Sequence, residues 1–165
     1  MKKALLIAAL VLIGSGLFAQ PDQKAPYEKF SGFPPINLLL PDSSTYFTKA
    51  DLKKNKAVLL VLFSPMCEHC QHETEEIIKN IDKFNDVQIL LVTSLPFDSM
   101  LTFRQKYDLE KYSNIVVAHD PHFFLIPYFQ IHNMPFLAFY DKKKQFISVH
   151  EGTMPIEQVI EEINK

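Results

Sequence analysis

Apolar runs and helical patterns alternate along most of the chain. Residues 57–63 are apolar without interruption, and 87–93 are apolar apart from Gln88 and Thr93, which predicts strands buried on both faces of a sheet. Apolar residues recur at helical spacing from Cys70 to Phe84, and 97–107 has the pattern of a further helix. With a third strand predicted at 114–120, this alternation favours an α/β sheet over a bundle or a sandwich.

The flanking segments predict additional strands and a final helix. A strand is expected at 36–40, and a bend after it leads to a short strand at 45–47. Residues 136–141 and 146–152 lie close enough along the chain to form an antiparallel hairpin. A last helix should begin at Pro155, because four apolar residues beyond it share one helical face.

The N-terminus has a different pattern from the rest of the chain. Lys2 and Lys3 precede an uncharged stretch that ends at Ala19, which predicts a secretory signal peptide over 1–19, with an uncleaved membrane anchor as the alternative. The polar, proline-containing segment 20–33 is interpreted as a leader or tether, and 34–165 as the folded domain. Either way, the domain is expected in an exported compartment, the periplasm in a cell with two membranes, where disulfides are permitted.

Length, composition and charge narrow the functional classes. A chain of 165 residues with 47% hydrophobic content suffices for one domain with its own core. The formal net charge is -2, and removal of two lysines with the signal peptide would make it -4. Because nucleic-acid binding demands a basic face, this partner class is set aside.

The two cysteines of the chain, Cys67 and Cys70, are the strongest chemical signal. They follow a predicted central strand and open a helix, where unpaired backbone N–H groups and the helix dipole favour a thiolate on Cys67. Cys70 lies one turn further in, within reach of Cys67, so the pair suits an attacking and a resolving thiol. Of the two residues between them, His69 should favour the reduced form and Glu68 should oppose it, and both are candidates for tuning the redox potential.

These features resemble the thioredoxin superfamily, and within it the exported TlpA/ResA-type thiol-disulfide oxidoreductases. The resemblance is carried by Cys-Glu-His-Cys with Glu73 three residues after Cys70, by Met134-Pro135 before the late strand, by the signal sequence and by the N-terminal extension. It implies a thioredoxin fold, with a central mixed β-sheet flanked by helices and an N-terminal β extension. Cys67 would be the nucleophile, Cys70 the resolving thiol and Pro135 a cis proline beside them, with Met134 in a groove for substrates.

The resemblance also implies an activity. The protein would exchange a Cys67–Cys70 dithiol or disulfide with the thiols and disulfides of exported proteins. No organic cofactor and no metal are expected, because the cysteines carry the electrons, and the protein is expected to be a monomer that contacts a membrane only through an uncleaved N-terminus.

One departure from thioredoxins leaves a role open. Thioredoxins place a buried Asp six residues before the first cysteine, and Val61 stands there instead. The proton acceptor for Cys70 is therefore not assigned by the sequence. Glu73, His69 or a residue of segment 119–133 are the candidates.

Two other functions compete with disulfide exchange. A copper or zinc chaperone is possible because Cys67, Cys70, His69 and His72 are clustered and further histidines stand at His119, His122, His132 and His150. However, the spacing supplies no second ligand pair.

A thiol peroxidase is the less favoured third hypothesis. Ser64 stands three residues before Cys67, where peroxiredoxins keep a Thr or Ser. Against it, Leu60 replaces their proline, and Arg104 is the only arginine of the chain.

Overall fold

The computed structural model describes residues 24–165. The predicted signal peptide, 1–19, and the first residues of the predicted leader lie outside the described residues. Among residues 24–165, no helix combines the length and the apolar character needed to cross a bilayer.

The predicted strands are all present, with ends that differ by at most one residue. They are β1 (Asn37–Leu39), β2 (Tyr46–Thr48), β3 (Ala57–Leu62), β4 (Val87–Thr93), β5 (Ile115–His119), β6 (Phe136–Tyr140) and β7 (Phe146–Glu151). The α-helices are α2 (Pro26–Lys29), α3 (Glu68–Lys79), α4 (Phe97–Lys106), α5 (Leu125–Phe129) and α6 (Ile156–Ile163). Residues 24–165 also contain three short 3-10 helices: η1 (Lys49–Asp51), η2 (Ile81–Phe84) and η3 (Leu109–Lys111).

The strands form one mixed sheet in the order β2-β1-β5-β4-β3-β6-β7. β3, β4 and β5 are parallel, whereas β6 pairs antiparallel with β3, and β7 with β6. β1 and β2 extend the sheet antiparallel beyond β5. The predicted α/β class, the central mixed sheet and the N-terminal β extension are therefore confirmed.

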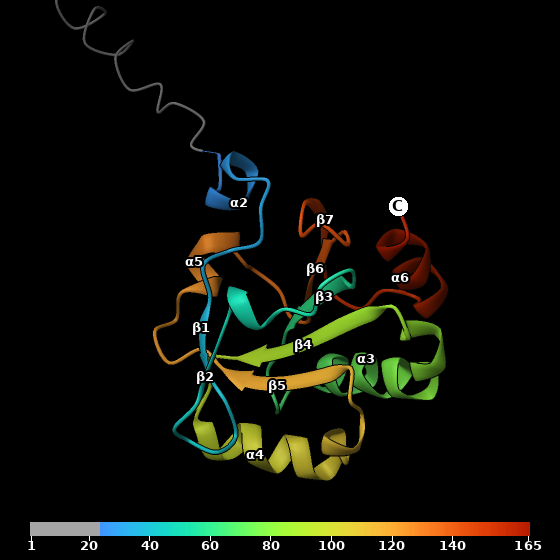
Figure 1. Ribbon diagram of the computed structural model, residues 1–165. Coiled ribbons are helices and arrows are strands. Elements are labelled where there is room, and N and C mark those ends of the chain that lie inside the picture. The colour runs from blue at the N-terminus through green and yellow to red at the C-terminus, as the bar shows by residue number, and fades with distance from the viewer. Residues whose placement is uncertain (1–23) are drawn as a thin grey trace, which may run out of the picture.

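Helices cover both faces of the sheet. The α3 and α4 connections each lead one strand further in the same direction, so the right-handed rule puts both on one face. The connection containing α5 returns across β4 and β3 to β6 and lies on the other face, as Figure 1 shows. β3 is buried on both sides: Leu59 and Val61 pack toward α3, α4 and α6, and Val58 and Leu60 pack toward α5.

The described part of the predicted leader packs against this second face. Residues 26–29 form α2, Gly32 bridges to Gln145, and Phe33 is buried. The Phe33 backbone N–H donates to the Lys144 carbonyl at 3.0 Å. The packed part of the chain thus begins upstream of Pro34, the residue at which the sequence placed the start of the domain.

The segment before β6 also contains structure that the sequence did not predict. α5 lies within the stretch 119–133, which has no clear helical period. It is held at its start by Asp120, whose Oδ2 accepts the Leu125 backbone N–H at 2.9 Å. Asp120 is fully buried, so this hydrogen bond satisfies a carboxylate that would otherwise be costly to bury.

Candidate active site

The cysteine pair lies where β3 ends and α3 begins. Cys67 is the N-cap residue of α3, with extended backbone, and its side chain is partly exposed. The Cys67 backbone N–H donates to the Ser64 carbonyl at 3.1 Å, and its carbonyl accepts the Gln71 N–H at 3.0 Å. This turn places the Cys67 sulfur at the positive end of a helix of 12 residues, as the sequence predicted.

Cys70 is in a different environment. It is 1% exposed, packs in the core under α3, and its Sγ accepts the Ser64 backbone N–H at 3.4 Å. Burial raises the pKa of Cys70 to about 12, and the nearby Cys67 thiol and Glu73 carboxylate add to the increase. Neither cysteine is in a disulfide in this structure, so the pair is a partly exposed thiol beside a buried one.

Glu73 is a buried carboxylate one turn beyond Cys70. It is 2% exposed; its Oε2 accepts the Met154 backbone N–H at 3.0 Å, and its Oε1 has no hydrogen-bond partner among the residues that the structure describes. Burial raises the pKa of Glu73, while His72 and His150 oppose that increase. The carboxylate borders a cavity of about 510 Å³ that opens between α3 and the start of α6.

The two residues between the cysteines are on the surface. Glu68 and His69 are both exposed in the first turn of α3. Charges in this position are screened by solvent, so their effects on the thiolate should be small compared with that of burial on Cys70.

Met134 and Pro135 reach the cysteines from β6. The Met134–Pro135 peptide bond is cis, as the resemblance implied. The Cys67 thiol points to the Met134 carbonyl oxygen, with 3.8 Å between Sγ and O. Pro135 is buried, and the Met134 side chain is partly buried against the core. Residues 67 apart in the sequence therefore meet at one edge of the sheet.

Met66 is a site residue that sequence analysis missed. It is 82% exposed directly before Cys67, an unusual position for a large apolar side chain. Its position directly before Cys67 is the sequence feature that could have identified it as a site residue. The loop is anchored from beneath, because the Gln71 side-chain amide donates to the Pro65 carbonyl at 3.0 Å, and Lys106 donates to the Gln71 side-chain oxygen at 2.9 Å.

No protein-family model and no curated protein matches the chain. Solved structures do resemble it. DsbF of MTB is 20% identical, with 79% of this chain and 93% of that chain covered and a TM-score of 0.66. A secreted disulfide oxidoreductase of Mycobacterium tuberculosis homologous to E. coli DsbE is 16% identical, with 79% and 95% covered and a TM-score of 0.65. The exposed lipoprotein thioredoxin Etrx1 of Streptococcus pneumoniae is 25% identical, with 77% and 98% covered and a TM-score of 0.59.

The chain has the thioredoxin fold. Within this fold, the cysteine pair lies at the first turn of α3, and Met134-Pro135 directly precedes β6. The position of the buried thioredoxin Asp is occupied by Val61, which is 1% exposed in the core of β3. Among the three candidates for the proton acceptor, Glu73 is buried and electrostatically coupled to Cys70, whereas His69 is exposed.

The structure gives no support to the metal hypothesis within this thioredoxin fold. In the part of the chain that the structure describes, no three His, Cys, Asp or Glu side chains gather in a way that suits a metal ion. His132 instead faces Glu151 at 3.6 Å, and the His119 ring packs edge-on against Phe97.

The peroxidase hypothesis also finds no support from the arginine. Arg104 forms an ion pair with Glu110 at 2.9 Å, between α4 and η3. This ion pair joins α4 to η3 and does not involve Cys67.

Proposed function

We propose that the protein is a thiol-disulfide oxidoreductase that exchanges a Cys67–Cys70 dithiol or disulfide with exported protein partners. The observation that carries the proposal is the asymmetry of the two thiols, one partly exposed at a helix N-terminus and one buried with its pKa raised to about 12. An attacking thiol needs access and thiolate character, and a resolving thiol needs protection from outside disulfides.

In the reducing direction, the Cys67 thiolate attacks one sulfur of the partner's disulfide, and the partner's other sulfur leaves as a thiolate. Cys70 then gives up its proton and attacks the Cys67 sulfur, which releases the partner's second thiolate. The partner's disulfide gains two electrons, and the cysteine pair loses two as its own disulfide forms. The oxidising direction is the reverse, and no organic cofactor is needed.

Glu73 is proposed as the group that takes the Cys70 proton. A carboxyl whose pKa is raised by burial is a better acceptor than an ordinary one, because it holds a proton closer to neutral pH. Within residues 24–165 its Oε1 accepts no hydrogen bond, which makes this oxygen a suitable site for the proton. The adjoining cavity, which His72 also lines, offers a path from Glu73 to solvent.

Met66 and Met134 are proposed to contact the partner. Both are beside Cys67, and flexible thioethers adapt to varied side chains. Glu68 and His69 are proposed to adjust the potential in opposite directions. An exported location is supported by the predicted signal peptide and by the secreted and surface-exposed proteins that share the fold.

Single-cysteine variants test the proposal. In an insulin-reduction assay with dithiothreitol, wild type should accelerate the reaction, and Cys67→Ser should reduce the rate to the uncatalysed level. Cys70→Ser should accumulate a mixed disulfide with insulin that non-reducing gels detect, because the resolving step is missing. Equal trapping by Cys67→Ser and Cys70→Ser would contradict the assigned roles, and a wild type without activity would contradict the function.

A further inference from the structure

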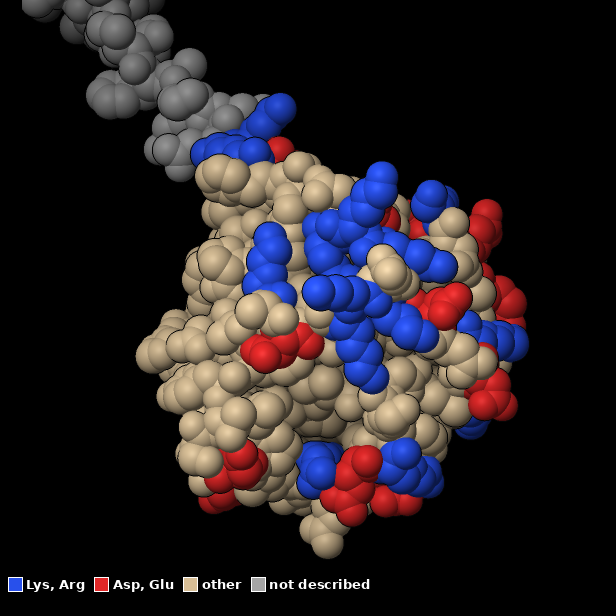
Figure 2. All heavy atoms as spheres, in the orientation of Figure 1, with Lys and Arg blue, Asp and Glu red and all other residues tan. Residues whose placement is uncertain are grey.

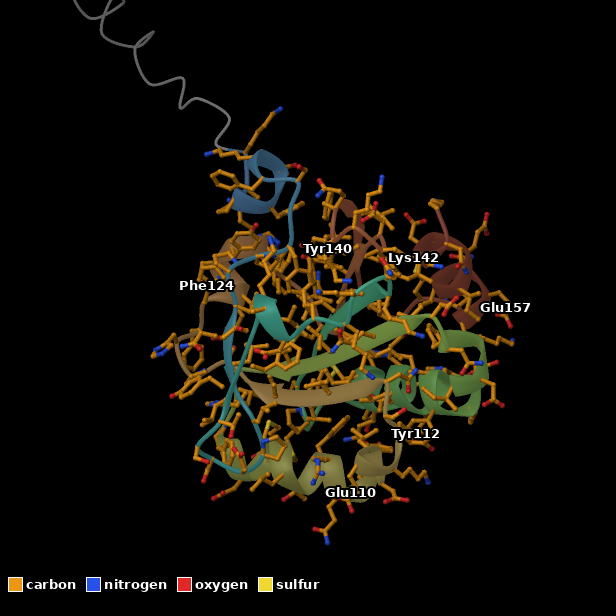
Figure 3. All side chains as sticks on the ribbon, in the orientation of Figure 1. Glu110, Tyr112, Phe124, Tyr140, Lys142 and Glu157 are labelled. Carbon is orange, nitrogen blue, oxygen red and sulfur yellow. The ribbon has the colours of Figure 1, made fainter. Side chains whose placement is uncertain are left out.

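A long apolar groove lies on the second face of the sheet, away from the cysteines. Its volume is about 920 Å³, and it runs between α2 with the segment after it and α5, with η1 at one end. Phe33, Phe124 and Tyr128 are among the side chains that line it, and Figure 3 shows Phe124 at the outer side of the α5 region. This size falls within the range of small-molecule sites, roughly 300 to 1,000 Å³.

The charged residues at the groove are all of one sign. Lys29 and Lys49 line it, and no Asp or Glu does. Both lysines are exposed, and within residues 24–165 neither ammonium makes an ion pair or a side-chain hydrogen bond. Lys49 reaches the groove wall, since a methyl group built on Gly32 would lie 3.6 Å from its Nζ. Two free cations thus flank an apolar trough.

A wider lysine cluster adjoins this end of the groove. It comprises Lys53, Lys54, Lys56, Lys142, Lys143 and Lys144. The two parts of the cluster are joined by Lys144, whose Nζ donates to the Lys53 carbonyl at 2.9 Å and to the Lys56 carbonyl. The cluster is next to the groove because Phe33 bonds to the Lys144 backbone. Figure 2 shows lysines gathered on this side of the molecule.

Some of this positive charge is neutralised, but not at the groove. Asp86 pairs with Lys56 at 3.2 Å and with Lys142 at 3.6 Å. Within residues 24–165, no carboxylate forms an ion pair with Lys29 or Lys49. The two charged side chains that line the groove, Lys29 and Lys49, therefore favour an anion there.

We propose that this groove binds a free anionic amphiphile, a medium-chain carboxylic acid, with its hydrocarbon against Phe33 and Phe124 and its carboxylate between Lys29 and Lys49. The apolar walls supply the affinity for the chain. The two ammonium groups supply charge-assisted hydrogen bonds to the carboxylate. The concave shape selects a single molecule over a bilayer, because a flat membrane surface does not enter a groove.

The proposal is independent of the disulfide chemistry. The groove is on the face covered by α2 and α5, and the adjoining lysine cluster lies near the start of β3 and the β6–β7 turn, marked by Lys142 in Figure 3. The cysteines follow the other end of β3. Loss of either activity would leave the other proposal standing.

Calorimetric titration of the full chain with hexanoate, octanoate and decanoate, each below its micelle concentration, tests the site. Affinity should rise by up to about fourfold for each added methylene. Decanol and decyltrimethylammonium carry a ten-carbon chain without the negative charge and should bind more weakly than decanoate.

Lysine variants locate the carboxylate. Lys29→Gln with Lys49→Gln should weaken decanoate binding by about tenfold or more and leave decanol binding unchanged. Lys79→Gln with Lys111→Gln removes the same charge elsewhere and should change neither. Phe30→Ala should weaken decanoate and decanol alike, because this 64% exposed ring lines the groove without supporting the core.

Several outcomes would overturn the proposal. They are an absence of saturable decanoate binding, equal loss in the two double-lysine variants, and decyltrimethylammonium binding as tightly as decanoate. Binding to anionic vesicles alone would assign the groove to a membrane. Concentration-dependent dimerisation in sedimentation that depends on Lys29 and Lys49, without decanoate binding, would assign it to a second copy of the chain.

Discussion

Two regions of the molecule, the thiol site and the apolar groove, contrast in how their chemistry arises. At the end where β3 leads into α3, a four-residue turn holds both thiols, and Met134 reaches Cys67 from far along the chain. On the sheet face covered by α2 and α5, the groove is assembled from α2, η1 and the α5 region, which lie far apart in the sequence. Local chemistry can be read from a motif, whereas chemistry assembled by tertiary contacts cannot.

The thiol site and the groove also differ in whether their charged and titratable groups are buried or exposed. The thiol end buries its titratable groups, so the pKa values of Cys70 and Glu73 are raised by burial. At the groove, Lys29 and Lys49 are exposed to solvent beside an apolar surface. Burial changes the reactivity of the groups themselves, while exposed charge acts on what approaches.

The largest expected effect concerns the two thiols. Brief treatment of reduced protein with iodoacetamide at pH 7.5 should modify Cys67 at least about a hundredfold faster than Cys70. The thiolate is the reactive form, and a pKa of about 12 leaves Cys70 almost entirely protonated, in addition to its burial. Peptide mapping by mass spectrometry measures both rates.

The control for this prediction is the unfolded protein. In 6 M guanidinium chloride the two rates should converge, because both burial and the helix N-terminus are lost. Comparable rates in the folded protein would show that the asymmetry at this end of the sheet is absent.

A smaller effect is expected when Glu73 is replaced. The folded-state pKa of Glu73 lies above the unfolded value of about 4.3, so the folded protein binds this proton more tightly, and stability falls as pH rises through that window. Glu73→Gln removes the buried charge and keeps an acceptor for Met154. The free energy of unfolding should rise by roughly 1 kcal/mol at pH 7, and the gain should vanish below about pH 4.

Glu76 provides the matched control. It lies one turn along the same helix and pairs with Lys79 at 2.6 Å, and this hydrogen bond lowers its pKa. Glu76→Gln should therefore destabilise the protein slightly at pH 7, and this loss should disappear as pH falls. Urea unfolding of both variants at pH 4 and pH 7 gives the comparison. A gain for Glu73→Gln that persists unchanged at low pH would contradict the burial argument.

The strands and the main helices could be predicted because their signals are local. β3 is apolar at every position and β4 at all but Gln88 and Thr93, and α3 and α6 have a clear apolar face. The thiol site followed from the two cysteines at the start of a helix, and the resemblance pointed to Glu73 and to Pro135. What no local pattern revealed was the burial of Glu73, which depends on the Met154 backbone 81 residues away.

The groove could not be predicted for the same physical reason. α5 has five residues and contains Pro127, too short a run for a helical period, and a side chain outside the helix, Asp120, holds its start. α2 and Phe33 are fixed by contacts with α5 and with the β6–β7 turn. Their segment is polar and rich in proline, so the sequence alone favoured a tether.

The smallest expected effect tests whether the thiol site and the groove are independent. The thiols follow β3 at the start of α3, whereas the groove lies on the sheet face covered by α2 and α5, and exposed charges are screened with a Debye length of about 8 Å at physiological salt. Lys29→Gln with Lys49→Gln should leave the rate of insulin reduction within about 1.5-fold of wild type, and saturating decanoate should do the same. Conversely, Cys67→Ser should bind decanoate with unchanged affinity. A threefold change in either direction that persists at 0.5 M salt would mean a coupling free energy of about 0.7 kcal/mol carried through the packed sheet, because screening would have removed a direct effect of the lysine charges on the thiolate.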